Sequence, residues 1–145
     1  MIESSILQPV VTLAGWTMVM WWWMYITRIP AMSKAGIDGA KMVGSTGASL
    51  RGQLPDSVSW KADNYNHLHE APTVFYAVAL VLAVTGQGDG LNALLAWIYV
   101  GLRIVHSLVQ ATANRVLVRF VLFALSSLVL MALVLHAAIF VFNWS

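Results

Sequence analysis

Four polar side chains recur at helical spacing within a stretch of the chain that is otherwise apolar. Arg103, His106, Gln110 and Asn114 stand at positions i, i+3, i+7 and i+11, which places them on one face of a helix. The residues around them are mostly leucine, isoleucine and valine, as in a helix that crosses a membrane. Charged groups inside a membrane are costly, and they usually face a bundle interior or a water-filled cavity with a function. We therefore expect the chemistry of this protein along this face.

A second polar cluster precedes a proline earlier in the chain. Asp63, His67 and Glu70 stand at i, i+4 and i+7, so they share one face of a helix. Pro72 has no backbone N–H and interrupts the helical hydrogen bonds, and the Thr73 hydroxyl is placed to satisfy a carbonyl left free. The pattern predicts a membrane helix that is distorted beside its polar cluster.

The two clusters together predict an ion pair. At a rise of 1.5 Å per residue, Glu70 and Arg103 lie about 12 Å and about 16 Å from the cytoplasmic ends of their helices. An unpaired charge at that depth is hard to tolerate, so we predict that these two side chains pair with each other. Such a pair favours a structural role over a catalytic one. His136 stands alone among the apolar residues of the last helix, which likewise favours a packing role.

The composition is that of an integral membrane protein. The chain of 145 residues is 59% hydrophobic and 10% charged, where a soluble domain carries roughly 25% charged residues. Its mean hydropathy is +0.75. About 20 apolar residues span a bilayer as a helix, and four apolar runs of that length predict an all-α, four-helix membrane bundle. The predicted helices cover approximately residues 5–28, 62–85, 91–114 and 117–142, with a long loop over approximately 29–60, in one membrane domain over 1–145.

The basic residues gather on one side of this predicted bundle. Lysines and arginines lie in or beside the first and third connections, while the N-terminus, the second connection and the C-terminus have none. The positive-inside rule places the two basic connections in the cytoplasm and both termini outside. The pI of 9.2 therefore reflects membrane topology, and we expect no nucleic-acid partner. The residues concerned are Arg28, Lys34, Lys41, Arg51, Lys61, Arg115 and Arg119.

Four helices alone make a thin bundle with little interior of its own. Polar faces on such a bundle need a protein partner, because lipid cannot satisfy their hydrogen bonds. We therefore expect a homo-oligomer surrounded by membrane lipids. The tryptophans are typical of the belt where a membrane meets water. They are Trp21, Trp22, Trp23, Trp60, Trp97 and Trp144.

Two kinds of site can be built from the polar residues. The first is a cationic cleft open to the cytoplasm, which suits an anionic polar ligand whose reaction partner is lipid-soluble. Its residues are Arg103, Arg115 and Arg119 with His106, Gln110 and Asn114, although Arg115 and Arg119 are also typical topology anchors. The second is a metal site, which no HExxH or histidine-rich pattern supports, so we expect no metal. Its donors would be His67, His69, Glu70 and His106.

Two segments carry a resemblance that covers essentially the whole chain. The first reads Asn64-Tyr-Asn-His-Leu-His-Glu-Ala-Pro-Thr-Val-Phe-Tyr76. The second reads Trp97-x-Tyr-x-x-x-Arg-x-x-His-x-x-x-Gln-x-x-x-Asn-Arg-x-x-x-Arg119. With four helices and a long first loop, they resemble the MAPEG family, the membrane-associated proteins of eicosanoid and glutathione metabolism, in its bacterial type.

The resemblance implies a homotrimer of four-helix protomers, with active sites at the subunit interfaces near the cytoplasmic side. In enzymatic members glutathione is the cosubstrate, and an arginine stabilises its thiolate for attack on a hydrophobic electrophile or for reduction of a hydroperoxide. One enzymatic branch has an arginine, a histidine three residues on, and a second arginine sixteen residues after the first. Arg103, His106 and Arg119 are similar in spacing, which implies that Arg119 is the catalytic arginine.

The helix before Pro72 departs from the pattern of the family. Enzymatic eukaryotic members carry Arg-x-x-x-Asn-x-x-Glu there, and this chain has Asp63 for the arginine and His67 for the asparagine. An acid in place of a base removes a partner for a glutathione carboxylate, which Asn64, Asn66, Arg51 or Lys61 is a candidate to replace. The ligand-binding residues implied are Arg51, Asn64, His67, Glu70, Arg103, His106, Gln110 and Arg115.

Two classes of function stay open at this point. The leading hypothesis is a membrane-bound, glutathione-dependent transferase or peroxidase that acts on a hydrophobic small molecule. The rival is a non-catalytic, lipid-binding or scaffolding member of the family, and a third possibility keeps the enzyme architecture with another thiol. As a bacterial member, the protein is expected to be a multi-pass protein of the inner membrane with both termini in the periplasm.

Overall fold

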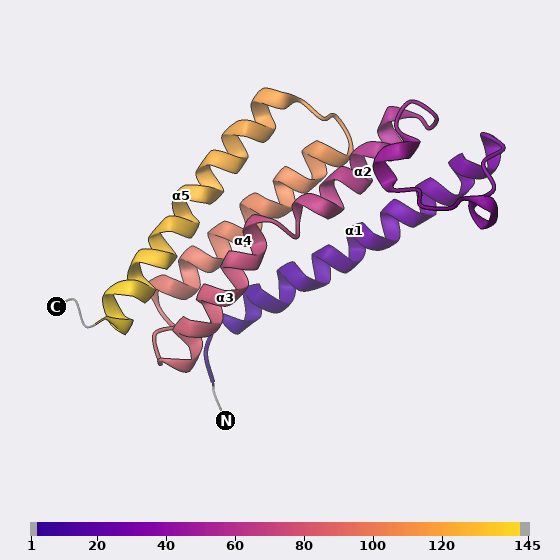
Figure 1. Ribbon diagram of the computed structural model, residues 1–145. Helices are drawn as coiled ribbons and strands as arrows, with labels where there is room; N and C mark the ends of the chain where they lie inside the picture. The colour runs from indigo at the N-terminus through magenta and orange to yellow at the C-terminus, as the bar shows by residue number, and fades with distance from the viewer. Residues whose placement is uncertain (1–2, 143–145) are drawn as a thin grey trace.

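The chain folds into a bundle of helices, two of which form the predicted second span (Figure 1). The computed structural model describes residues 3–142, in which no β-strand forms. The helices are α1 (Leu7–Lys34), α2 (Asp56–His67), α3 (Ala71–Val84), α4 (Leu91–Ala111) and α5 (Val116–Val141), with two short 3-10 helices, η1 (Gly39–Lys41) and η2 (Gly47–Leu50). α4 packs against α1, α2 and α5. Both ends of the described chain lie at one end of the bundle, and the α1–α2 connection lies at the other.

The predicted second membrane helix is present but is divided into α2 and α3. α2 begins at Asp56, earlier than the predicted residue 62, and residues 68–70 leave the helix before α3 begins. Pro72, in the first turn of α3, has no N–H to continue the hydrogen bonds of α2. The Thr73 hydroxyl donates to the carbonyl of Glu70 at 2.6 Å, which confirms its predicted role. One proline therefore separates two helices within a single span.

The first helix is longer, and the first loop shorter, than the sequence predicted. α1 continues past Pro30 to Lys34, so the loop covers residues 35–55 and not 29–60. The helix ends where Gly36 adopts a left-handed φ of +69°, and the next amide, of Ile37, donates to the carbonyl of Met32 at 3.0 Å. A proline removes one helical hydrogen bond without supplying the left-handed turn that ends a helix, which is why Pro30 lies within α1.

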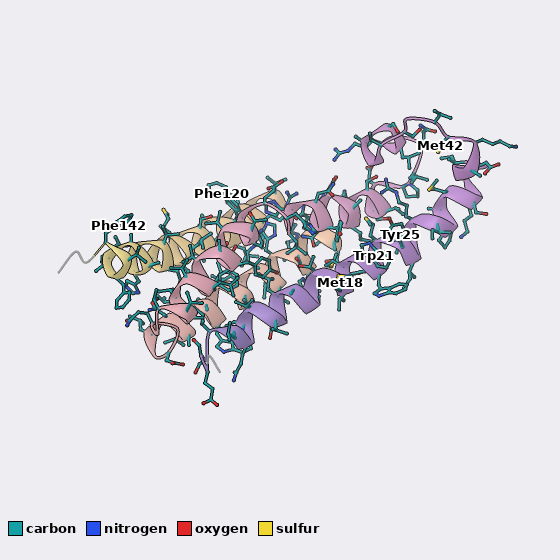
Figure 2. The ribbon with its side chains drawn as sticks, turned by 60° about the horizontal axis from the view of Figure 1, so that its bottom comes forward. Met18, Trp21, Tyr25, Met42, Phe120 and Phe142 are labelled. Atoms are coloured by element: carbon teal, nitrogen blue, oxygen red, sulfur yellow. The ribbon has the colours of Figure 1, made fainter. Side chains whose placement is uncertain are left out.

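The first loop folds back onto α1 and α2. Leu50, Leu54 and Val58 form a small buried cluster, against which Met42 packs at the loop end of the molecule (Figure 2). This cluster fixes the backbone on both sides of Arg51. The loop is therefore ordered against the bundle and carries an arginine to the side of α2.

Three helical stretches are long and apolar enough to cross a membrane, which identifies an integral membrane protein. They are Asp56–Val84, Leu91–Ala111 and Val116–Val141. α1, the fourth predicted span, does not reach that hydropathy, because tryptophan, threonine and glutamine lower its average. It lies alongside the others, and its residues Met18 and Tyr25 point away from the bundle (Figure 2). Trp144, predicted to lie in the interfacial belt, is outside the described residues.

The end of the bundle opposite the loop is closed by the N-terminal segment. Ile6 N donates to the carbonyl of Gly88 at 2.9 Å, and Ser5 N donates to Asp89 Oδ1 at 2.8 Å. Hydrogen bonds from Ser5 hold the pKa of the Asp89 carboxyl below its usual range. These contacts tie the start of α1 to the turn between α3 and α4.

His136 has the packing role that the sequence predicted. Its Nδ1 lies 2.7 Å from Asn92 Oδ1, and Asn92 Nδ2 donates to the carbonyl of Gln87 at 2.8 Å. The histidine thus links α5 to the start of α4 through a satisfied hydrogen bond.

Replacing Gly88 with alanine tests the packing of the N-terminal segment against the turn between α3 and α4. An added Cβ would meet Ser4 Oγ and would lie 2.7 Å from Ile6 Cγ2, closer than real Cβ atoms approach. We expect Gly88→Ala to lower the free energy of unfolding by about 1–3 kcal/mol, because the branched Ile6 side chain has little freedom to move aside. Thermal unfolding in detergent measures the effect. Gly101→Ala is the control, since a Cβ there meets no atom within 4 Å. Equal losses in the two variants would contradict the prediction.

Candidate functional site

Arg103 joins α4 to the break between α2 and α3. Its side chain is 1% exposed, and Nη2 donates to the carbonyl of His67 at 3.4 Å. That carbonyl belongs to the C-terminal end of α2, where a positive charge is favourable. Within residues 3–142, Nε and Nη1 of Arg103 have no hydrogen-bond partner. The guanidinium therefore stabilises the break between α2 and α3 by donating a hydrogen bond to a backbone carbonyl.

The predicted ion pair between Glu70 and Arg103 is wrong. No nitrogen of Arg103 lies within 4.0 Å of the Glu70 carboxylate in the described part of the chain. Glu70 Oε2 instead lies 2.8 Å from Nδ1 of His67, and its side chain is 67% exposed. The depth argument assumed a continuous helix. Because α2 ends at His67, Glu70 leaves the helical face that would direct its side chain toward α4.

The polar face of α4 is confirmed for three of its four residues. Arg103, His106 and Gln110 are all buried in α4. Asn114 does not continue this face, because α4 ends at Ala111 and Asn114 has a left-handed φ of +48°. Asparagine tolerates this conformation better than most residues, and its N–H donates to the carbonyl of Val109 at 2.7 Å. The helix thus stops one turn earlier than predicted.

Two side chains of α2 serve the packing of α4. Asn64 is fully buried, and its Nδ2 donates to Gln110 Oε1 at 2.9 Å. Lys61 Nζ donates to the carbonyls of Ser57 at 2.8 Å and Ala111 at 3.1 Å, so it caps the C-terminus of α4. Both side chains are thus held by the bundle, and the possibility that Lys61 replaces the missing arginine of the family pattern gains no support.

Arg119 is held by Asn114 across the α4–α5 connection. Its Nη1 donates to Asn114 Oδ1 at 2.6 Å. Its Nε is buried and, in the part of the chain that the structure describes, has no partner. Asn114 therefore ends α4 and orients the guanidinium of α5. Sequence reasoning placed Asn114 on a helix and missed this role, although its position five residues before Arg119 was visible.

A polar cavity of about 380 Å³ lies between α2, α4, the start of α5 and the first loop. It brings together five of the predicted site residues, Arg51, His67, Glu70, Gln110 and Arg119. Trp60, Asp63, Asn66 and Asn114 complete its lining. The predicted residues Asn64, Arg103 and Arg115 do not line it. Arg115 precedes the first turn of α5 and is exposed.

The polar cavity contains the acid that the family pattern does not predict. Asp63 Oδ1 accepts a hydrogen bond from Arg51 Nη2 at 2.6 Å. Arg51 comes from the first loop, which folds back beside α2. The loop arginine therefore compensates the charge of Asp63. It also adds a cation to the lining of the polar cavity, to which α2 contributes no lysine or arginine.

An apolar cavity of about 270 Å³ adjoins the polar cavity. Its lining is His67, His106, Val116, Arg119, Phe120 and Phe123. His67 and Arg119 line both cavities. The ring of His67 lies between those of His106, at 4.9 Å, and Phe123, at 5.8 Å between centroids. A polar ligand and an apolar ligand could therefore meet at Arg119 and His67.

Four lining residues were not predicted to belong to a site, namely Trp60, Val116, Phe120 and Phe123. Phe120 and Phe123 were assigned only to the apolar last helix, yet they share its first two turns with Arg119. Their spacing of one and four residues from the arginine was the available signal. Among the described residues, no three histidine, aspartate, glutamate or cysteine side chains gather as metal ligands.

The left-handed conformation of Asn114 predicts a difference between two substitutions. Alanine and glycine both remove the bond to Arg119, but a Cβ at φ +48° costs roughly 1–2 kcal/mol. We expect Asn114→Ala to have a free energy of unfolding about 1 kcal/mol lower than Asn114→Gly. Thermal unfolding of the two variants in one detergent measures the difference. Asn114→Ala at least as stable as Asn114→Gly would show that the backbone conformation is not required.

The chain matches the model of the MAPEG family over residues 6–139. Comparison with curated proteins and with solved structures gives no significant match. The matched segment includes all five helices of the bundle almost completely, and with them both cavities. Because the match covers nearly the whole chain, this integral membrane protein belongs to the MAPEG family, as its two polar segments predicted.

Proposed function

We propose that this protein is a glutathione-dependent transferase or peroxidase that acts on hydrophobic electrophiles in the membrane. The observation that carries the proposal is the pair of adjoining cavities, one polar and one apolar, that share Arg119 and His67. Membership of the MAPEG family supports a glutathione-related role in general. The two cavities suit a reaction between a water-soluble thiol and a lipid-soluble partner.

The polar cavity carries groups that fit glutathione, which has two carboxylates, an amine and a thiol. Arg51 can pair with a carboxylate, and the exposed carboxylate of Glu70 can pair with the amine. Arg119 lines this cavity, and its Nη1 donates to the neutral Asn114 Oδ1, so its positive charge stays available to an anionic ligand. These residues therefore match the charges of the cosubstrate that the family implies.

Arg119 is the proposed catalytic residue. A guanidinium beside a thiol stabilises the thiolate and raises its reactive fraction at neutral pH. From this position the thiolate can attack an electrophilic carbon in the apolar cavity, and the leaving group departs with the electron pair of the broken bond. With a hydroperoxide, the thiolate sulfur attacks the terminal oxygen, and the O–O bond breaks to release the alkoxide, which takes a proton to become the alcohol. A second glutathione then attacks the sulfur of the sulfenic acid, and the disulfide forms with loss of water. His106 lines the apolar side, and Gln110 lines the polar side.

We further propose the homotrimer of the family, with the cavities at the subunit interfaces. Phe120 is 64% exposed and Val116 is 75% exposed, so the apolar cavity has an open side that a second copy would cover. α2 and the α4–α5 connection, which carry most of the lining of the polar cavity, lie toward the loop end of the bundle, away from both ends of the described chain (Figure 1). This end carries the basic connections, which by the positive-inside rule supports the proposal of a cytoplasmic site with both termini on the other side of the membrane. The proposal of a bacterial inner membrane, with these termini in the periplasm, rests on the resemblance to the bacterial type of the family.

One observation favours an alternative. Arg51 is already paired with Asp63 at 2.6 Å, and a glutathione carboxylate must compete with that partner. A different thiol with fewer negative charges, or a lipid in a non-catalytic scaffold, would not meet this competition. Glutathione binding therefore separates the hypotheses.

Substitution of Arg119 tests catalysis. We expect Arg119→Ala to lower kcat/KM for conjugation of glutathione to an aryl halide by about 10²–10³-fold, as for other lost donors to a developing anion. Arg119→Lys keeps the charge and should lose less. Lys34→Ala, which removes an exposed cation at the end of α1, is the control and should keep full activity. Activity that survives in Arg119→Ala would remove this arginine from the mechanism.

Thermal unfolding with added glutathione tests binding at Arg51. A ligand at 100 times its dissociation constant stabilises a protein by about 2.7 kcal/mol. We expect Arg51→Ala to weaken glutathione binding and Asp63→Asn to strengthen it, because Asp63 competes for the same guanidinium. The dissociation constants are obtained from the shift of the melting temperature as a function of glutathione concentration. No shift in the unmodified protein would favour the scaffold or another thiol.

A further inference from the structure

His67 occupies the boundary between the two cavities. It is the last residue of α2, and among the described residues only His67 and Arg119 line both the polar and the apolar cavity. Its side chain is 20% exposed, so the imidazole is largely covered yet reaches both spaces. A group that moves a proton between a thiol and water would need this position.

Glu70 orients the His67 ring. Glu70 Oε2 lies 2.8 Å from His67 Nδ1, and a carboxylate can only accept a hydrogen bond, so Nδ1 carries the proton. Nε2 then bears the lone pair and is free to accept a proton. The two residues are three apart in the chain, the spacing of neighbours on a helical face, and their contact is present although residues 68–70 leave the helix. The arrangement is that of a histidine base held by a carboxylate.

Charged groups from several elements lie around His67. Arg103 donates to its backbone carbonyl, Arg119 lines both cavities with it, and the Glu70 carboxylate contacts its ring. The ring of His106 lies 4.9 Å away and contributes a titratable group on the apolar side. The paired Arg51 and Asp63 line the polar cavity together with His67.

His67 is the one histidine among the described residues that both lines the two cavities and contacts a carboxylate. His106 lines the apolar cavity alone and is 2% exposed. His69 lines neither cavity, and its Nδ1 lies 2.8 Å from the carbonyl of Tyr65. His136 hydrogen bonds to Asn92 at the other end of α4.

We propose that His67 is the general base of the reaction, and this inference rests on the proposed function. His67 Nε2 takes the proton of the thiol S–H while Arg119 stabilises the thiolate that remains. The sulfur then forms a bond to the electrophilic carbon, and the bond to the leaving group breaks with its electron pair on the leaving group. The imidazolium returns its proton to water through the polar cavity. Glu70 is a positioning residue that holds the ring and stabilises the imidazolium.

The test is the pH dependence of conjugation in His67→Asn, with His69→Asn as the matched control. Asparagine can still bond to Glu70 but cannot take a proton. We expect His67→Asn to lower kcat/KM by about 10²-fold near neutral pH, a typical loss for a general base. The loss should shrink as the pH rises, because a thiol with a pKa of about 8.5 ionises in water without a base. His69→Asn should keep the profile of the unmodified protein.

A second readout does not need an electrophile. Ultraviolet absorbance of the thiolate, measured when glutathione binds at neutral pH, should appear in the unmodified protein and in His69→Asn but be reduced in His67→Asn. A loss by one constant factor at every pH, or full thiolate formation in His67→Asn, would overturn the assignment and leave the proposed function standing. Absence of both glutathione binding and conjugation in the unmodified protein would overturn the proposed function, and His67 as its base would fall with it.

Discussion

The break in the second membrane span, and the arginine that supports it, are the constraint on which the site depends. Inside a membrane every backbone carbonyl needs a partner, since water is not available. Pro72 prevents one continuous helix, and the buried Arg103 donates to the carbonyl of His67 at the end of α2. The break is thus tolerated because the neighbouring helix α4 places a hydrogen-bond donor beside the free carbonyl. Without it, the polar side chains of this span would follow a regular helical face.

The break also determines which charges are free to act. Glu70 lies outside the helix and contacts His67 and not Arg103, so a carboxylate and an imidazole line the polar cavity together. The cations nearby are held mainly by neutral oxygens. Lys61 donates to carbonyls, and Arg119 donates to the amide of Asn114. Partners of this kind orient a cation without neutralising it, so its charge stays available to an anionic ligand.

The first loop gives the site a feature that differs from the helical pattern of the family. Arg51 reaches α2 because Leu50 and Leu54 anchor the loop on either side of it. Its pairing with Asp63 offsets the acid that stands where enzymatic relatives have a base. A cation on a loop can move more readily than one on a helix. The proposed binding of a ligand carboxylate at Arg51 would therefore compete with the salt bridge that joins the loop to α2.

The residue pattern was enough to predict the class of protein, the family, the four apolar spans and the buried polar face of Arg103, His106 and Gln110. These follow from local quantities, namely hydropathy over a span, the period of the helix and the spacing of two motifs. The hydrogen-bond and salt-bridge partners of the polar side chains could be assigned only from the folded structure. The sequence paired Glu70 with Arg103 because it treated the second span as a straight helix, whereas three residues outside the helix redirected the side chain. The role of Asn114 and the meeting of two cavities at His67 likewise depend on how separate helices approach each other, which spacing along one chain does not specify.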